Sequence, residues 1–180
     1  MHPDPSFVDI FRCEYSDLAF DVNGGLVALT GAPARQHRGL YGAYLTFQQQ
    51  VTRNASEDPN GGLRLFLNAV VADSATTVTD HQIAAGLTYT GPFASRPHDV
   101  IGFAAGTTHV NSSLTNAQNL QNSLGLGPVR VKNSEYVLEL YYTFAPVPGL
   151  LIRPNLQYVY TPGTVSENKD ILVLGLKTVI

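Results

Sequence analysis

Apolar and polar side chains alternate along this chain in runs of about ten residues, and each run is bounded by Gly, Pro, Asn or Asp. Alternation with a period of two is typical of strands, because successive side chains of a strand point to opposite faces. Helical periodicity is nearly absent. The pattern predicts strands at residues 40–51, 62–73, 81–90, 100–110, 135–144, 150–161 and 170–180.

The segments between these runs predict little further regular structure. The weaker run 25–29 is an eighth strand or part of a loop, and we expect residues 1–24 to be an irregular segment. In 111–128, which is rich in Asn, Gln and Leu, the side chains of Leu114, Leu120 and Leu124 align on one face of a short helix. No linker divides the chain into two domains.

The length of the runs bears on the environment of the sheet. Strands of soluble proteins average about five or six residues, whereas a tilted strand that crosses a bilayer needs about 9–11. Within 135–144, Tyr136, Leu138 and Leu140 lie on one face, opposite Glu135, Val137 and Glu139. A soluble sandwich with an apolar interior alternates in the same way.

Aromatic side chains lie near the ends of the predicted strands, on the more apolar face. If the chain reverses at each turn, they form two rims, Tyr41, Tyr136, Tyr158 and Tyr160 at one end and Tyr89, Tyr142 and Phe144 at the other. Two aromatic belts around an aliphatic band are typical of membrane interfaces, but aromatic residues are also enriched in strands generally. The residues alone leave open a transmembrane β-barrel and a soluble all-β domain.

Composition excludes several other classes of protein. Only 14% of the 180 residues are charged, against about 25% in an average soluble domain. The formal net charge of -3 argues against a nucleic-acid partner. The single cysteine, Cys13, excludes an intrachain disulfide and a cysteine-based zinc site. No apolar run reaches the ~18 residues of a transmembrane helix, and Met1–Pro5 lacks the basic and apolar regions of a signal peptide.

Catalytic and metal-binding motifs are not evident. The five histidines are scattered without the spacing of a metal site, and there is no nucleophile elbow or phosphate loop. Glu135 and Glu139 lie four residues apart on one strand face, about 13 Å at the usual strand rise. That separation exceeds the ~9.5 Å limit for the carboxyl pair of most glycosidases. We therefore expect no enzyme activity, no cofactor and no metal ion.

Four segments resemble a known family of channel proteins. They are LTGAPARQHRG at 29–39 with Tyr41 and Gly42, GLTYTGPF at 86–93 with RPHD at 96–99, PNLQYVYTPG at 154–163, and LVLGLK at 172–177. In this order they resemble the carbohydrate-selective porins of Gram-negative bacteria, the OprB-like family. The resemblance runs from about Tyr15 to Ile180, most of the chain.

The resemblance implies an outer-membrane, antiparallel transmembrane β-barrel of about sixteen strands. Such a barrel passes glucose and other sugars by passive diffusion through a polar lumen. This chain would supply the C-terminal portion of the barrel at 25–180, with about seven or eight strands and without the N-terminal half and its inward loop. It stops at Ile180, where the family usually continues to a terminal aromatic residue, and it has Asn155 where an acidic residue is expected. The implied partners are outer-membrane lipid and monosaccharides, and self-association is left open because many porins are trimers.

If the face rich in Leu and Tyr meets lipid, the opposite face lines water. Donors, acceptors and charges of mixed sign would then offer weak contacts to neutral sugars. Glu139 and Arg153, on adjacent strands, are expected to pair, and lumen charges can also serve only to stiffen the wall. The predicted lumen-lining residues are Gln48, Gln50, Arg64, Asn68, Gln82, Thr88, Glu135, Glu139, Tyr141, Arg153, Asn155, Gln157 and Lys177.

Two alternatives to a porin remain. One is a complete eight-stranded outer-membrane barrel with a structural or adhesive role, which would need an interior filled by side chains. The other is a soluble β-domain that binds carbohydrate. The soluble domain needs no detergent, whereas a membrane barrel regains its β structure only in micelles.

Overall fold

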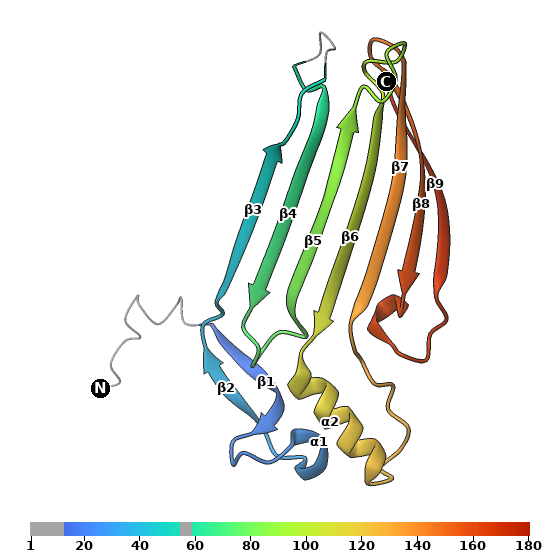
Figure 1. The fold of residues 1–180 in the computed structure, drawn as a ribbon. Helices are drawn as coiled ribbons and strands as arrows, with labels where there is room; N and C mark the ends of the chain where they lie inside the picture. The colour runs from blue at the N-terminus through green and yellow to red at the C-terminus, as the bar shows by residue number, and fades with distance from the viewer. Residues whose placement is uncertain (1–12, 55–58) are drawn as a thin grey trace, which may run out of the picture.

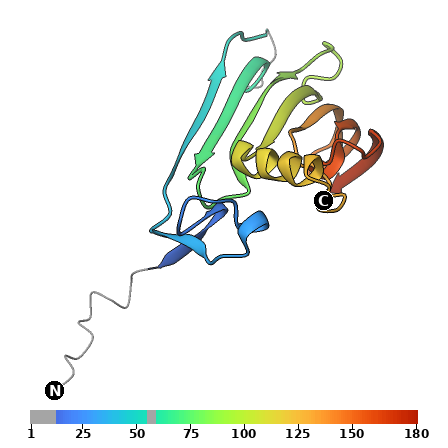
Figure 2. The ribbon, with the colours of Figure 1, turned by 90° about the horizontal axis from the view of Figure 1, so that it is seen from below.

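One antiparallel sheet of seven strands dominates the computed structural model, which describes residues 13–54 and 59–180. The strands follow one another in the sheet in chain order, and the sheet curves as an open arc with β3 and β9 at its edges (Figures 1 and 2). All seven strands predicted from the alternation are confirmed. They are β3 (Gly42–Gln50), β4 (Gly62–Ala72), β5 (Thr79–Thr90), β6 (Val100–Val110), β7 (Glu135–Val147), β8 (Leu150–Tyr160) and β9 (Ile171–Val179).

A second, two-stranded sheet lies at one end of the large sheet, beside its longest connection (Figure 1). It pairs β1 (Glu14–Asp21) with β2 (Ala34–Arg38), and the short helix α1 (Val27–Thr30) lies between them in sequence. Residues 14–21 were expected to be irregular. The run 25–29 is not an eighth strand, because α1 begins at Val27 and ends at Thr30, followed by Gly31 with a φ of 65°.

The connection between β6 and β7 contains α2 (Ser112–Ser123), which lies across the end of the large sheet next to α1 and β1 (Figures 1 and 2). The helix begins after Asn111, whose side-chain oxygen accepts the backbone N–H of Ser113 at 2.8 Å. The helix predicted within 111–128 is thus present but shorter. A further 3-10 turn, η2 (Pro162–Thr164), lies between β8 and β9.

Pro154 lies inside β8, where it cannot donate a hydrogen bond to the sheet. It is paired with Leu176 of β9. Toward β7, pairing runs as far as Asn155 and resumes at Ile152. The ladder therefore lapses around the residue that lacks an N–H, and the strand continues past it.

The large sheet carries most of its apolar side chains in the open. Phe103, on the central strand β6, is 41% exposed, and Leu140 on β7 is 49% exposed. The buried hydrophobic residues of the described chain are only Ala19, Val110 and Ala117. A soluble sandwich would cover one face of such a sheet with a second layer. No helix in the described part of the chain is long and apolar enough to span a membrane.

Candidate functional site

The strand register divides the side chains of the large sheet into two faces. Residues directly opposite each other on antiparallel strands point to the same face. Leu138 is paired with Ala105 of β6 and with Tyr158 of β8, whereas its neighbour Glu139 is paired with Ala104 and Gln157. Following these pairs from β3 to β9 gives one apolar face and one polar face.

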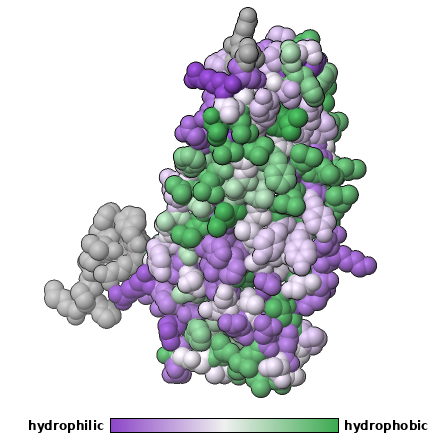
Figure 3. All heavy atoms as spheres, viewed as in Figure 1, coloured by the Kyte–Doolittle hydropathy of each residue, from purple (hydrophilic) through white to green (hydrophobic). Residues whose placement is uncertain are grey.

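The apolar face is a band of aliphatic side chains with aromatic residues near both strand ends. Figure 3 shows hydrophobic side chains gathered across the strands, with more hydrophilic ones above and below them. At the end where α2 lies, the rings of Tyr136 and Tyr160 are 6.1 Å apart. By register and alternation, this face carries the seven aromatic residues predicted for it, Tyr41, Tyr89, Tyr136, Tyr142, Phe144, Tyr158 and Tyr160.

The polar face holds the residues that the alternation assigned to a water-filled side. Its basic groups lie toward the end opposite α2 and its acidic groups lie nearer α2. The pairing places on this one face Gln48, Gln50, Arg64, Asn68, Gln82, Thr88, Glu135, Glu139, Tyr141, Arg153, Asn155, Gln157 and Lys177. Whether any of them contacts a sugar stays a prediction.

Tyr141 lies flat against the sheet on this face, because Gly102 beneath it has no side chain. A Cβ atom built on Gly102 would be 2.2 Å from the ring of Tyr141, far inside van der Waals contact. The guanidinium carbon of Arg153 lies 4.4 Å from the centre of the same ring. The Nε of Arg153 also donates to the Thr143 hydroxyl at 2.7 Å. Ring and hydroxyl together hold the Arg153 cation in one position on the polar face.

Glu139 and Asn155 form a second fixed contact, in which the Asn155 amide donates to the Glu139 carboxylate at 2.8 Å. Asn155 fits there because its partner on β9 is Gly175, where a Cβ would be 2.0 Å from the Asn155 side-chain oxygen. The expected Glu139–Arg153 pair does not form in this described part of the sheet. Glu139 is level with Gln157, four residues along β8 from Arg153, which is about 13 Å.

Between these groups and β4, the polar face is lined by very small residues. Ala84 and Gly86 of β5 are paired with Gly106 and Ala104 of β6. A hollow of about 250 Å³ lies over Ala84, Ala104 and Gly106, and Glu135 and Glu139 of β7 form part of its wall. The small residues leave room for a solute beside fixed polar side chains.

The loop between β5 and β6 is anchored to β7 by a buried carboxylate. Asp99, 1% exposed, accepts two hydrogen bonds from Arg96 at 2.9 and 3.0 Å, one from the Ala145 backbone N–H at 2.9 Å, and one from the Tyr142 hydroxyl. Burial acts to raise the pKa of Asp99, but the hydrogen bonds from Arg96, Tyr142 and Ala145 and the Arg96 charge outweigh it and lower the pKa below its ordinary value. Arg96 also lies 4.0 Å from the centre of the Phe144 ring.

The structure also brings together three side chains that sequence spacing did not connect, Asp80, His81 and His109. The two histidines lie 28 positions apart in the chain, so no local motif joins them. Their meeting follows from the pairing of β5 with β6, in which His81 is directly opposite His109. A predicted strand register would have been the signal that could reveal this cluster.

Comparisons with known proteins all match this chain to porins. Residues 12–180 match the family model described as "Carbohydrate-selective porin, OprB family". The chain is 38% identical over 168 residues to Porin B of Pseudomonas aeruginosa, which covers 89% of this chain and 37% of that protein. It is 33% identical over 155 residues to the putative porin QuiX of Acinetobacter baylyi, covering 81% of this chain and 35% of that protein.

A solved structure shows the same arrangement of strands. The high pH structure of Pseudomonas putida OprB superposes with a TM-score of 0.85 at 40% sequence identity, covering 93% of this chain and 41% of that one. The chain therefore spans little more than a third of the length of the two curated relatives.

Proposed function

Because this chain belongs to the OprB family of carbohydrate-selective porins, we propose that it forms part of the wall of an outer-membrane channel through which sugars such as glucose diffuse passively. Proteins of this family are β-barrel porins of the outer membrane, channels rather than enzymes. The proposal covers what the family name leaves open, namely the solute, the completeness of the barrel and the residues that line the path.

The observation that carries the proposal is the two-sided character of an uncovered sheet. Apolar side chains in the middle of the sheet, such as Phe103 and Leu140, are 41% and 49% exposed. Fully burying a side chain of this kind contributes about 1.5–3 kcal/mol, so a sheet that leaves many exposed needs another apolar phase. Lipid supplies that phase, and the aromatic residues near both strand ends then lie at the two membrane interfaces.

We infer that the curved sheet forms one part of the wall of a closed barrel. In the described part of the chain, the outer edges of β3 and β9 are unpaired. Unpaired backbone groups are costly in lipid, and a closed barrel has no such edges. We place residues 25–180 in the C-terminal portion of a barrel of about sixteen strands, whose remaining strands pair with these two edges. In this arrangement the polar face lines the lumen.

The lumen would pass neutral sugars because its polar groups offer many weak contacts. The Arg153 guanidinium, the Glu139 carboxylate and the amides of Asn155 and Gln157 provide donors and acceptors that replace water around a sugar. Basic and acidic groups are both present, so the wall does not favour one sign of charge strongly. Each contact must stay weak, because tight binding would prevent exit.

Liposome swelling with the complete porin polypeptide that carries this sequence tests the proposal. We expect faster swelling in glucose than in gluconate, an anionic solute of similar size. Gln157→Leu should slow glucose entry without abolishing it, whereas the matched change Leu156→Val on the apolar face should leave the rate unchanged. A folded protein that produces no swelling, or one that is monodisperse in buffer without detergent, would overturn the proposal.

A further inference from the structure

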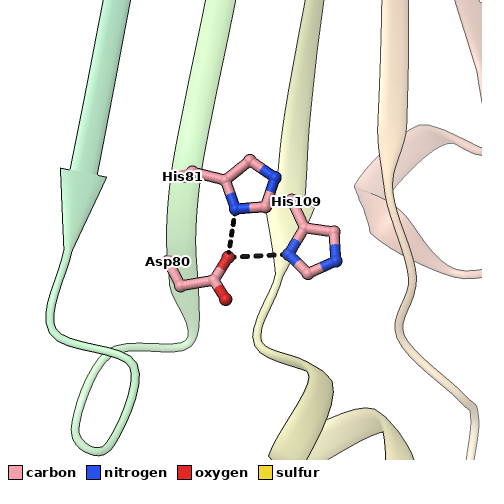
Figure 4. Close-up of side chains that lie close together, drawn as sticks. All are labelled: Asp80, His81 and His109. Atoms are coloured by element: carbon pink, nitrogen blue, oxygen red, sulfur yellow. Dashed lines mark hydrogen bonds and ion pairs between the residues drawn. The ribbon is translucent and has the colours of Figure 1, made fainter.

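We propose that Asp80, His81 and His109 form a binding site for a divalent transition-metal ion, with Zn²⁺ as the reference ion. The three side chains lie at the α2 end of the apolar face, on β5 and β6 (Figure 4). Asp80 Oδ1 lies 2.8 Å from His81 Nδ1 and 2.6 Å from His109 Nδ1. Three atoms that are all common metal ligands therefore converge on one point.

The pairing of β5 with β6 brings these three side chains together. His81 and His109 are directly paired across β5 and β6, and their rings stack with centres 4.2 Å apart and 14° between the planes. Regular alternation would turn Asp80 to the face opposite His81. The register shift between Thr79 and His81 interrupts that alternation, so Asp80 reaches both imidazoles. The spacing of the three groups thus depends on strand pairing and not on a flexible loop.

The donor set selects the class of ion. Two imidazole nitrogens and one carboxylate oxygen suit Zn²⁺, Cu²⁺ or Ni²⁺, whereas Mg²⁺ and Ca²⁺ prefer oxygen ligands alone. The candidate ligand atoms all lie within 4.8 Å of one another. Bonds of about 2.0–2.2 Å to each of them are reached if the imidazoles tilt and the three atoms move slightly apart. The side chains of His81, Asp80 and His109 are 39%, 16% and 25% exposed, so they are not packed tightly enough to prevent that movement.

Protons and solvent access are also compatible with an ion. In the hydrogen-bonded cluster, a neutral imidazole donates its single N–H from Nδ1 to Asp80. When Nδ1 binds a metal ion, that proton moves to Nε2, which points away from Asp80 (Figure 4). Water can complete the coordination, as in three-ligand zinc sites. The ion would join β5 to β6 just before the chain leaves the sheet at Asn111 for α2.

Metal binding is measured on the untagged, complete porin polypeptide that carries this sequence, folded in detergent micelles, by competition between the protein and a chromogenic chelator for Zn²⁺. We expect the wild-type protein to compete with the chelator for Zn²⁺. His81→Ala, His109→Ala and Asp80→Asn should each weaken it at least ~10-fold, since even the loss of a group behind a metal ligand costs ~10–100-fold. His37→Ala is the matched control, because His37 also contacts one carboxylate, Asp17 at 2.9 Å, and belongs to β2 instead.

Electron paramagnetic resonance of bound Cu²⁺ supplies a second readout that needs no variant to fold. The proposal requires coupling to two imidazole nitrogens in the wild-type protein. Coupling to fewer nitrogens, or a Zn²⁺ affinity no higher than that of the folded His81→Ala protein, would show a hydrogen-bonded cluster only and overturn the proposal. Both measurements detect metal binding and involve no sugar transport. Their failure would therefore leave the proposed sugar channel untouched, and the reverse also holds.

Discussion

Gly102 shows how one residue without a side chain shapes the polar face. The ring of Tyr141 occupies the space that a Cβ at this position would need, at 2.2 Å. Arg153 in turn rests on that ring. The position of a charged group on the wall therefore depends on a glycine one strand away from the aromatic ring and two strands away from the charge.

We expect Gly102→Ala to displace the Tyr141 ring and destabilise the folded protein by about 1–3 kcal/mol, the usual cost of overpacking. The same change in a Tyr141→Ala background should cost much less, because the displaced ring is then absent. Unfolding by urea in detergent, measured for the four members of this double-mutant cycle, checks the coupling. Equal costs in both backgrounds would contradict the contact.

Asp99 is the residue whose replacement should most weaken the β5–β6 loop. Asp99→Asn keeps the size of the side chain but removes its negative charge. It also replaces one of the two carboxylate oxygens, which accept hydrogen bonds from Arg96 and from the Ala145 N–H, with an amide NH₂ group. We expect a loss of about 1–3 kcal/mol in the free energy of unfolding, the cost of leaving buried polar groups without full partners. Glu167→Gln, at an exposed position between η2 and β9, is the control for a general effect of removing one carboxylate.

The pH dependence of the Asp99 contribution has a definite sign. Because the pKa of Asp99 is lowered in the folded protein, its contribution is fully present above the ordinary carboxyl pKa of about 3.9. It is lost as the pH falls through the lowered folded value. The stability difference between the wild-type protein and Asp99→Asn should therefore be constant near neutral pH and shrink under acidic conditions. A difference that grows on acidification would show that the carboxylate is not stabilised in the folded state.

At the scale of elements, the period of two was sufficient to predict the seven long strands and the two faces of the sheet. It worked because a strand exposed to two different environments must alternate. It could not predict β1, in which the Asp17 side chain accepts the backbone N–H groups of Ala19 and Phe20, each at 2.9 Å. α1 depends on a left-handed Gly31 rather than on an apolar pattern.

Pair contacts within the site were less predictable than the faces. Alternation assigns a side chain to a face but not to a level along the strand, so Glu139 and Arg153 were expected to pair although they lie about 13 Å apart along the ladder. The register also decides which residues meet across strands. His81 and His109 come together only because β5 and β6 pair at that level.

The two faces should respond differently to the same new charge. Leu140→Lys puts an amine on the apolar face of β7, and we expect it to destabilise the folded protein by about 2–4 kcal/mol if that face meets the middle of a bilayer. Val137→Lys puts the same amine on the polar face of the same strand and should be tolerated. Heat-modifiable gel mobility after folding into lipid vesicles measures the folded fraction, and equal losses for both variants would contradict the assignment of faces.

For the whole molecule, the two open edges set the behaviour of the isolated chain. Within residues 13–54 and 59–180, no strand pairs with the outer edge of β3 or of β9, and Leu174 on β9 is 81% exposed. Such edges favour pairing between chains. We therefore expect the 180-residue chain alone to aggregate or to form β structure in micelles without making vesicles permeable to glucose. Glucose-selective swelling by this chain alone would show that it closes or assembles a channel by itself.

The order of the strands has a consequence for how the sheet forms. Each strand of the large sheet pairs with the strands next to it in sequence, and β7 and β8 are joined only by Pro148 and Gly149. Closing so short a loop loses little chain entropy, and folding rates rise as contacts become more local in sequence. The β7–β8 hairpin can therefore act as an early folding nucleus, with later strands added one at a time to an existing edge. In such a sequence β3, the edge strand farther from the hairpin, joins the sheet last.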